Sequence, residues 1–269
     1  CTWPAAGNYA GNCGWLTQSG CAMSDWVSRQ VIDRQLPSRW SPVGYQRWTK
    51  LLFLHWRWDP GEIQKRLPRG LAVDDFDGSA WIGIVPFFMG GVRPAGFPPL
   101  PVVSNFLELN LRTYVRDESG RPGVWFFSLD ANQPLAVWAA RLLFALPYQH
   151  ATMRANQVDG WTDYVSARSG REPVLNYRYR PKGAVTEAAL GSLEFFLIER
   201  YRLFAFRGGQ LFSGRVYHMP YQLSAADLDY YDPRLFELDG FDVPVRLPDH
   251  VCYAPRVDVS VYLPEPVAD

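Results

Sequence analysis

Apolar and polar residues alternate in short runs along most of the chain after residue 47, and residues that favour turns separate these runs. Strict alternation is typical of β-strands with one buried face. Asp77-Gly78, Asp159-Gly160 and Gly208-Gly209 each stand between two runs and predict tight hairpins. The predicted strands are residues 51–58, 71–76, 79–88, 106–116, 124–130, 148–158, 161–168, 174–180, 202–206, 211–218 and 257–263.

A few helices are predicted between the strands. Asp59, Pro60 and Glu62 fit the start of a helix, with a capping side chain, a proline in the first turn and a second capping side chain. Pro147 ends another helical pattern, and residues 90–101 are rich in Gly and Pro and predict a long loop. The predicted helices are residues 60–67, 134–146, 192–201 and a segment that begins at the capping-box pattern of residues 224–227.

No repeat, low-complexity tract or linker interrupts this pattern, which predicts one α+β domain over residues 23–269, around a large, curved, mostly antiparallel sheet. Residues 1–22 differ from the rest because they contain no charged residue. They lack the basic and apolar regions of a signal peptide, and Met23 follows them like an ordinary start. We expect them to be a non-native or misassigned extension.

Charge and cysteine content indicate which partners and which cellular compartment to expect. Lys and Arg together number 27, as do Asp and Glu, so the formal net charge is zero. A general nucleic-acid binder needs a basic surface, and we therefore expect no nucleic-acid partner. No uninterrupted apolar stretch reaches the ~18 residues of a membrane span, so we expect no membrane insertion. Beyond residue 22 the only cysteine is Cys252, which favours a cytoplasmic protein.

Most catalytic signatures are absent from the sequence. It contains no glycine-rich phosphate loop, no nucleophile elbow and no H-E-x-x-H pattern. The histidines are far apart and never at the spacing of metal ligands; they are His55, His150, His218 and His250. We therefore expect neither a metal nor a cofactor.

The predicted strand at 106–116 carries the clearest chemical pattern. Its side chains alternate, so Glu108, Asn110, Arg112 and Tyr114 share one side and the leucines share the other. If only the leucines face the core, the polar row faces water. If the sheet curves around a cavity, the row lines a pocket, where Arg112 can hold an anion and Glu108 can act as an acid or base. The sequence leaves both readings open.

For four residues on neighbouring segments, the sequence likewise does not show whether they face a pocket or water. Ser128 and Asp130 lie on the next predicted strand, and Tyr148 and His150 follow Pro147. Ser128, His150 and Asp130 are the residue types of a hydrolytic triad, but their spacing does not show that they meet. The candidate proton-transfer groups are Glu108, Tyr148 and His150, and the candidate ligand contacts are Asn110, Arg112, Tyr114, Ser128 and Asp130.

An ordered series of short motifs runs from about Trp48 to Tyr262. In sequence order, the motifs are His55-Trp56, Leu67-Pro68-x-Gly70-Leu71, Asp77-Gly78-x-Ala80-Trp81, Glu108-x-Asn110-x-Arg112-Thr113-Tyr114-Val115, Gly123-Val124-x-Phe126-Phe127-Ser128-Leu129-Asp130, Ala140-Arg141, Leu146-Pro147-Tyr148 and Glu199-Arg200-Tyr201. The series resembles the YqjF-like family of bacterial proteins, a domain of unknown function numbered 2071. The order of the motifs is far more specific than any one of them.

The resemblance implies an acetoacetate decarboxylase-like fold, in which curved, mostly antiparallel sheets form a barrel-like body around an internal pocket, with few peripheral helices. In acetoacetate decarboxylases a lysine that follows a proline forms a Schiff base with the keto substrate. Here Tyr148 or Gln149 stands at that place, after Pro147. Schiff-base chemistry is therefore disfavoured, since none of the lysines is expected to replace it; they are Lys50, Lys65 and Lys182.

The sequence thus predicts a small-molecule pocket with lysine-free acid–base chemistry, of the lyase or isomerase type, on a carbonyl, carboxylate or phenolic compound. The first alternative is a sensor or sequestering protein that uses the same pocket without turnover. The second is an interaction module whose Pro-rich loop at residues 93–101 binds a partner protein. A homo-oligomer is compatible with all three.

Overall fold

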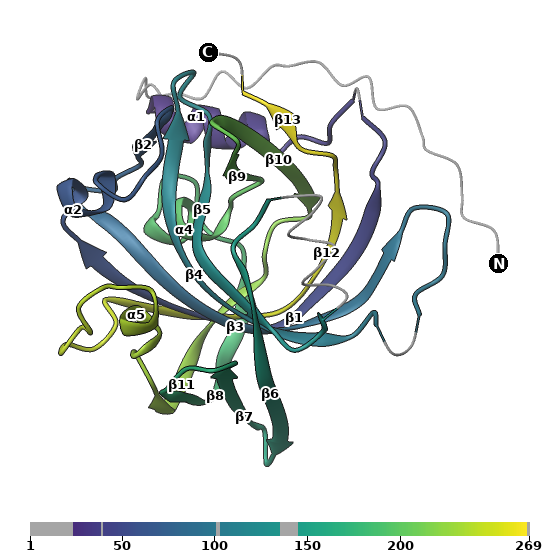
Figure 1. The fold of residues 1–269 in the computed structure, drawn as a ribbon, viewed down its shortest axis with the longest axis vertical. Coiled ribbons are helices and arrows are strands. Elements are labelled where there is room, and N and C mark those ends of the chain that lie inside the picture. Colours follow the sequence, from purple (N-terminus) through teal and green to yellow (C-terminus); the bar gives the residue numbers. More distant parts are fainter. Residues whose placement is uncertain (1–23, 39, 101–102, 135–144, 268–269) are drawn as a thin grey trace.

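The computed structural model describes residues 24–38, 40–100, 103–134 and 145–267. β-strands make up most of this part of the chain (Figure 1). They are β1 (Gly44–Trp58), β2 (Leu71–Val73), β3 (Ala80–Pro94), β4 (Phe106–Asp117), β5 (Pro122–Ala131), β6 (Tyr148–Val158), β7 (Trp161–Arg168), β8 (Val174–Thr186), β9 (Arg202–Arg207), β10 (Gln210–His218), β11 (Leu223–Tyr231), β12 (His250–Val261) and β13 (Glu265–Pro266). The helices are α1 (Asp25–Asp33), α2 (Pro60–Gln64), α4 (Leu193–Ile198) and α5 (Leu235–Leu238).

The strands form a sheet that closes on itself in two rings. One ring follows the order β10-β9-β5-β4-β3-β1-β12 and returns to β10. The other follows β5-β6-β7-β8-β11-β12-β1-β3-β4 and returns to β5. Most pairs are antiparallel, whereas β5 runs parallel to β6 and to β9. The predicted α+β architecture of curved, mostly antiparallel sheets with a barrel-like body is confirmed.

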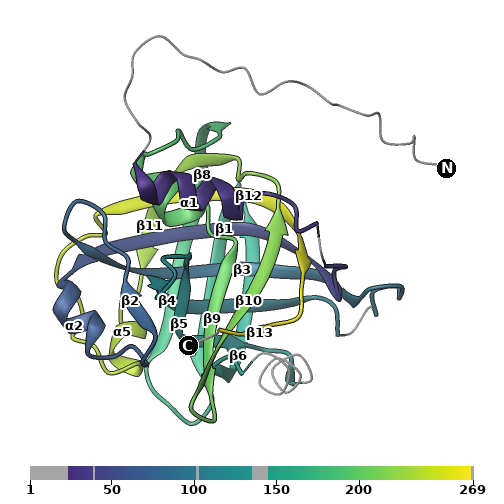
Figure 2. The same ribbon diagram turned by 90° about the horizontal axis from the view of Figure 1, so that it is seen from above.

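Strands β12, β1, β3, β4 and β5 belong to both rings and form a shared wall with a buried region on each side. Figure 2 shows β1, β3 and β4 side by side, with β9 and β10 running steeply across them. On one side of the wall, Leu109 and Leu111 lie in a packed cluster with Trp56. On the other side, Val85 and Leu129 belong to a second cluster. Both faces of β4 are therefore inside the molecule, and its polar row does not face water.

Several local predictions agree with the structure. The hairpin of β4 and β5 forms, and so do the predicted pairings of β6 with β7 and of β9 with β10. Asp159, with φ 50°, and Gly160, with φ 78°, form the tight turn between β6 and β7. Asp59 caps α2 by accepting a 2.9 Å hydrogen bond from the Glu62 amide, and Ser192 caps α4 in the same way through the Phe195 amide.

Two predictions of local structure are wrong. Residues 71–76 do not pair with 79–88, because β2 pairs with β4 and only a Phe76–Ser79 bridge crosses the turn. The capping-box pattern at residues 224–227 lies in strand β11 rather than in a helix, because β8 provides backbone partners along it and β12 pairs with its start. The pairing partner overrides the local propensity at this position.

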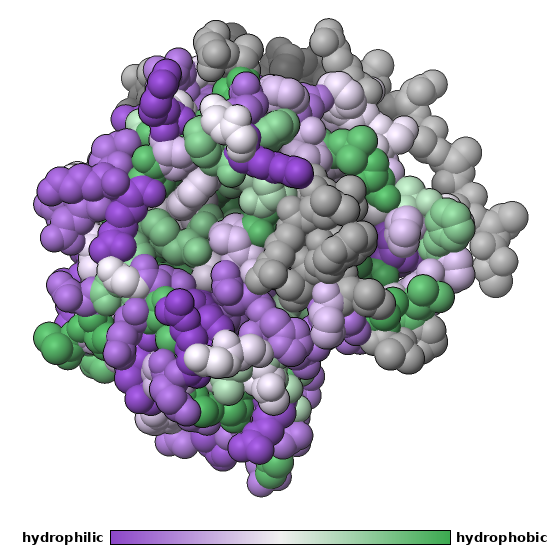
Figure 3. Space-filling model, viewed as in Figure 1, coloured by the Kyte–Doolittle hydropathy of each residue, from purple (hydrophilic) through white to green (hydrophobic). Residues whose placement is uncertain are grey.

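Other element boundaries also differ from the predicted ones. Strand β3 extends to Pro94, into the predicted loop, and the helix α1 was not predicted. The extension at residues 1–22 and residues 135–144 of a predicted helix lie outside the described residues. Figure 3 shows apolar residues gathered at the right edge, over the loop that follows β3, where Phe97 is 67% exposed. Within the described ranges, no helix is both long and apolar enough to cross a bilayer.

Candidate functional site

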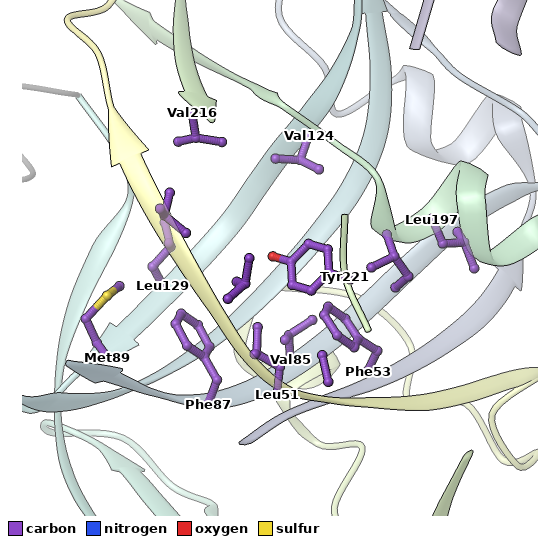
Figure 4. Close-up of a cluster of buried hydrophobic side chains, with 14 of the residues drawn as sticks. Leu51, Phe53, Val85, Phe87, Met89, Val124, Leu129, Leu197, Val216 and Tyr221 are labelled. Atoms are coloured by element: carbon purple, nitrogen blue, oxygen red, sulfur yellow. The ribbon is translucent and has the colours of Figure 1, made fainter. Parts of the chain in front are cut away.

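A cavity of about 220 Å³ lies inside the ring that contains β9 and β10. Most of its wall is apolar, and Figure 4 shows Phe87, Leu129 and Val216 arranged around a common space, with the Tyr221 hydroxyl turned toward it. The apolar lining residues are Leu51, Val85, Phe87, Met89, Val92, Phe106, Phe126, Leu129, Leu146, Leu203, Val216 and Val261. An apolar cavity with a few polar groups is the usual form of a small-molecule site.

Strand β4 contributes three polar residues to the wall. Glu108, Asn110 and Arg112 line the cavity, as their alternation along the strand requires, and Tyr148 joins them from the start of β6. Tyr114 follows in the same row and is fully buried, but its hydroxyl meets His55 instead of the cavity. The structure thus brings together four of the eight candidate site residues.

Glu108 is a buried acid held beside a phenol. The Tyr148 hydroxyl donates a 2.8 Å hydrogen bond to Glu108 Oε2, and only 3% of the Glu108 residue is exposed. Burial raises the pKa of Glu108 to about 7, against hydrogen bonds from Tyr148 and Asn110 that favour the charged form; the charge of Asp130 adds to the rise. A carboxyl with this pKa both donates and accepts a proton near neutral pH.

Arg112 is a guanidinium with no carboxylate partner among the residues that the structure describes. Its two hydrogen bonds are long, 3.4 Å to the Tyr114 hydroxyl and 3.5 Å to the Leu197 carbonyl, and its Nε has no partner in the described part of the chain. The cation lies 5.3 Å from the centre of the Phe53 ring. Such a cation offers several unused N–H donors to an anion in the cavity.

Ser128 and Asp130 lie on the opposite side of the wall. A β-bulge between the pairs Leu111–Ser128 and Arg112–Phe126 turns Phe126 and Leu129 toward the cavity. Ser128 and Asp130 instead meet Arg168, at 2.8 Å and 2.9 Å, and Arg168 also contacts Asp239 at 2.8 Å. The structure therefore places these two candidate ligand contacts in a separate, buried ionic cluster.

His150 also lies away from the cavity. Its side chain is exposed, and Nδ1 lies 2.9 Å from the Ser169 hydroxyl. Asp130 contacts Arg168 and Ser128 contacts both Arg168 and Asp239, so the three residue types of a triad are not assembled. Of the three candidate proton-transfer groups, the structure joins Glu108 and Tyr148, and His150 lies apart from both.

None of the three lysines of the chain lines the cavity. Lys50 bonds to Gln157, Lys182 pairs with Asp227, and Lys65 is exposed at the end of α2. Tyr148 occupies the cavity wall directly after Pro147, where the resemblance places a lysine. No group of three or more His, Cys, Asp or Glu in the described ranges could hold a metal ion.

Sequence reasoning missed the residues that close the cavity from the far side. Arg215 and Val216 come from β10, and Tyr221 comes from the turn after it. No local pattern marks them, because their role depends on the pairing of β10 with β12 that closes the ring. The motifs did include Phe126 and Leu129, but strict alternation along the strand could not reveal the bulge that turns them inward.

Comparison of the sequence with known proteins gives relatives along most of its length. The profile of the DUF2071 family, described as an uncharacterized conserved protein, matches residues 45–258. The Uncharacterized protein YqjF of Bacillus subtilis (strain 168) is 37% identical over 215 residues, which cover 80% of this chain and 88% of that protein.

Comparison of the structures gives several acetoacetate decarboxylase-like neighbours at 14% identity. An acetoacetate decarboxylase superposes with a TM-score of 0.61 over 89% of this chain and 97% of that chain. The acetoacetate decarboxylase of Legionella pneumophila gives 0.58 over 94% and 99%. The enduracididine biosynthesis enzyme MppR gives 0.60 over 85% and 89%. These similarities show the fold alone, and they confirm the fold that the motifs implied.

Proposed function

The chain belongs to the DUF2071 family of uncharacterized conserved proteins and has an acetoacetate decarboxylase-like fold, and from this premise we propose that its barrel binds a small, largely apolar acid through Arg112. The observation that carries the proposal is the Arg112 guanidinium itself. It borders an apolar cavity and has no carboxylate partner in the described part of the chain. A ligand anion supplies the missing partner.

The cavity limits the size and chemistry of this ligand. A dry cavity of about 150 Å³ admits benzene, so about 220 Å³ accommodates a ring or branched alkyl group with a short acidic arm. The acid faces Arg112, and the apolar part lies against Phe87 and Leu129. The enduracididine biosynthesis enzyme is known complexed with pyruvate, which makes 2-oxo acids suitable first probes.

Glu108 gives this site its reactive group. Its pKa of about 7 and its hydrogen bond to Tyr148 suit a residue that moves a proton to or from a ligand held by Arg112. No lysine lines the cavity, so the chemistry is acid–base work of the lyase or isomerase type without a Schiff base. If the ligand binds without turnover, the same pocket serves a sensor or sequestering protein.

Isothermal titration calorimetry with phenylpyruvate, phenylacetate and the neutral phenylacetamide tests the binding site. We expect both acids to bind more tightly than the amide, because only they carry a negative charge for Arg112. Arg112→Met should weaken binding of the acids about 10- to 100-fold, as loss of a charged hydrogen bond worth ~1.5–3 kcal/mol implies. Arg116→Met is the matched control, since Arg116 lies on the same strand but is exposed beside Asp74.

Acids that bind no better than the amide, or an Arg112→Met protein that binds them as tightly as the unmodified protein, would overturn the proposed site. Turnover is tested separately, by following deuterium uptake next to the carbonyl of a 2-oxo acid in D₂O. We expect exchange above the uncatalysed rate that Glu108→Gln removes. Binding without any such exchange would assign the pocket to a sensor.

A further inference from the structure

A chain of hydrogen-bonding groups leads from Arg112 away from the cavity. Arg112 Nη2 lies 3.4 Å from the Tyr114 hydroxyl, and that hydroxyl lies 2.7 Å from His55 Nε2. His55 Nδ1 lies 2.9 Å from His250 Nδ1, and His250 Nε2 lies 3.8 Å from Glu194 Oε1. The chain therefore joins β4, β1, β12 and α4, which are distant in the sequence.

A glycine lets this chain cross the intervening strand. Strand β3 lies between β1 and β4, and Gly83 is the register partner of both His55 and Arg112. A Cβ atom at this position would lie 2.8 Å from His55 Cδ2, closer than real Cβ contacts come. Only glycine therefore leaves the imidazole enough room to reach the Tyr114 hydroxyl across β3.

The two ends of the chain favour one direction for the hydrogen bonds in it. A guanidinium only donates, so the Tyr114 oxygen accepts from Arg112, and its own hydrogen is available to His55 Nε2. His55 then carries its proton on Nδ1 and donates to His250 Nδ1. His250 in turn carries its proton on Nε2, which points at the Glu194 carboxylate, a group that only accepts. One arrangement of protons thus gives each of the three hydrogen bonds a donor and an acceptor, and it turns the His250 Nε2–H toward the Glu194 carboxylate, 3.8 Å away.

We propose that Tyr114, His55, His250 and Glu194 position Arg112 for its ligand and make the affinity of the pocket depend on the protonation of His250. This proposal deepens the proposed function and rests on it. The four are positioning residues, because none of them lines the ligand cavity. Protons from the solvent reach His250 at a second crevice, of about 440 Å³, which His250 and Glu194 line beside α4 and β12.

Of the two histidines, His250 is the one that contacts solvent. Its side chain is 9% exposed, whereas His55 is fully buried. A proton added to His250 places a hydrogen on its Nδ1, opposite the hydrogen already on His55 Nδ1. His55 must then move its proton to Nε2, where it opposes the Tyr114 hydroxyl hydrogen. The Tyr114 oxygen then accepts from His55 as well as from Arg112, and its own hydrogen loses its acceptor in the chain. The hydrogen bond that holds Arg112 is weakened as a result.

The groups around the two histidines favour protonation of His250 before His55. Burial lowers the pKa of His250, and the carboxylate of Glu194 opposes that shift. Burial, together with His250 and Arg112, lowers the pKa of His55 well below its usual range. The other titratable residues that line the crevice are Glu187 and Cys252. His250 therefore takes the proton before His55 as the pH falls.

The first test needs no ligand. Long-range proton–nitrogen NMR spectra of the histidine-labelled protein at pH 7.5 report which ring nitrogen carries the proton. We expect the Nδ1–H form at His55 and the Nε2–H form at His250. The opposite forms at either ring would overturn the directional chain, whatever the pocket binds.

The second test is the pH dependence of phenylacetate affinity. In the unmodified protein we expect the affinity to fall as the pH is lowered from 7.5 to 5. In His250→Asn, the amide oxygen replaces Nδ1 as the acceptor and does not titrate, so we expect the fall to be reduced. Glu108 also titrates near pH 7, but it is the same in both proteins, and the difference between the two profiles isolates His250.

Tyr114→Phe removes the link next to Arg112 and should lower phenylacetate affinity about 3- to 10-fold at pH 7.5, as the loss of a neutral hydrogen bond implies. Tyr177→Phe is the matched control, because the Tyr177 hydroxyl is buried in the other core without a hydrogen-bond partner among the described residues. It should leave the affinity unchanged.

The outcomes separate this inference from the proposed function. If Arg112→Met abolishes binding while His250→Asn keeps the pH profile of the unmodified protein, the coupling is overturned and the ligand site stands. If the unmodified protein binds no acid at any pH, the proposed function falls and the coupling falls with it. The tautomers then still show whether the directional chain exists.

Discussion

The two sides of the shared wall differ in how an arginine is paired. On the outer side of β5, Arg168 lies between Asp130 and Asp239, with ion-pair distances of 2.9 Å and 2.8 Å, and also donates to Ser128. On the cavity side of β4, Arg112 has only two long hydrogen bonds and no carboxylate in the described ranges. Of the two arginines, only Arg168 is paired with carboxylates of the described residues.

This difference separates a structural ion pair from a binding site. The Arg168 cluster ties strand β7 to β5 and to the segment that follows α5, and its donors are largely used. Arg112 and Glu108 share one strand face but do not pair with each other, so their charges remain available to a ligand. A charge in a protein interior normally has an opposite charge beside it. Half-buried Arg112 has none among the described residues, which marks it as a site for a ligand anion.

The largest effect on stability is expected when the ion pairs of Arg168 are removed. Arg168→Met leaves Asp130 and Asp239 buried without a cation, and we expect the free energy of unfolding to fall by about 3–5 kcal/mol. Urea unfolding measures this change. Arg178→Met is the control, because Arg178 forms exposed pairs that contribute about 0–1 kcal/mol. Equal losses in the two variants would contradict a structural role for the Arg168 cluster.

A smaller effect is expected from the titration of Glu108. Its pKa is raised on folding from 4.5 to about 7, so the folded state holds a proton that the unfolded state releases. Stability therefore falls as the pH rises from 4.5 to 7, by up to about 3 kcal/mol. Glu108→Gln should remove this part of the decline in urea unfolding between pH 5 and pH 8. The same pH slope in both proteins would show that Glu108 is ionised throughout that range.

The smallest effect on stability is expected at Arg112. Arg112→Met strands no carboxylate in the described part of the chain, and the methionine fills part of the same space, so we expect a change of about 1 kcal/mol or less. Urea unfolding beside Arg168→Met makes the comparison directly. A loss as large as that of Arg168→Met would mean that Arg112 is a structural residue and not a ligand contact.

Sequence patterns predicted the structure correctly where a single strand and its turn determine it. The alternation of β4 placed Glu108, Asn110 and Arg112 on one face, and Asp159-Gly160 marked a hairpin that forms. The polar row alone did not show that this face is internal. That depends on the closure of β10 onto β12, a contact between distant segments.

The failures share the same physical origin. Ser128 was a candidate only because it lies on the strand next to the polar row, and one extra residue in the bulge of β5 turns it to the side away from the cavity. His150 follows Tyr148 by two residues, a spacing that puts both side chains on one face of a regular strand. In the structure Tyr148 is buried and His150 is exposed, because the buried positions of β6 do not alternate regularly at its start. His55 and His250 looked unrelated along the chain, and only the pairing of β1 with β12 brings them together. Register and closure are tertiary properties that local patterns do not encode.

The most direct test of the central claim is a crystal structure of the protein grown with phenylacetate. The account predicts that the ligand carboxylate lies within hydrogen-bond distance of the Arg112 guanidinium, with its ring against Phe87 and Leu129. Arg168 should keep its two protein carboxylates in the same crystal. A ligand bound outside the cavity, or Arg112 paired with a carboxylate of the protein itself, would contradict the account.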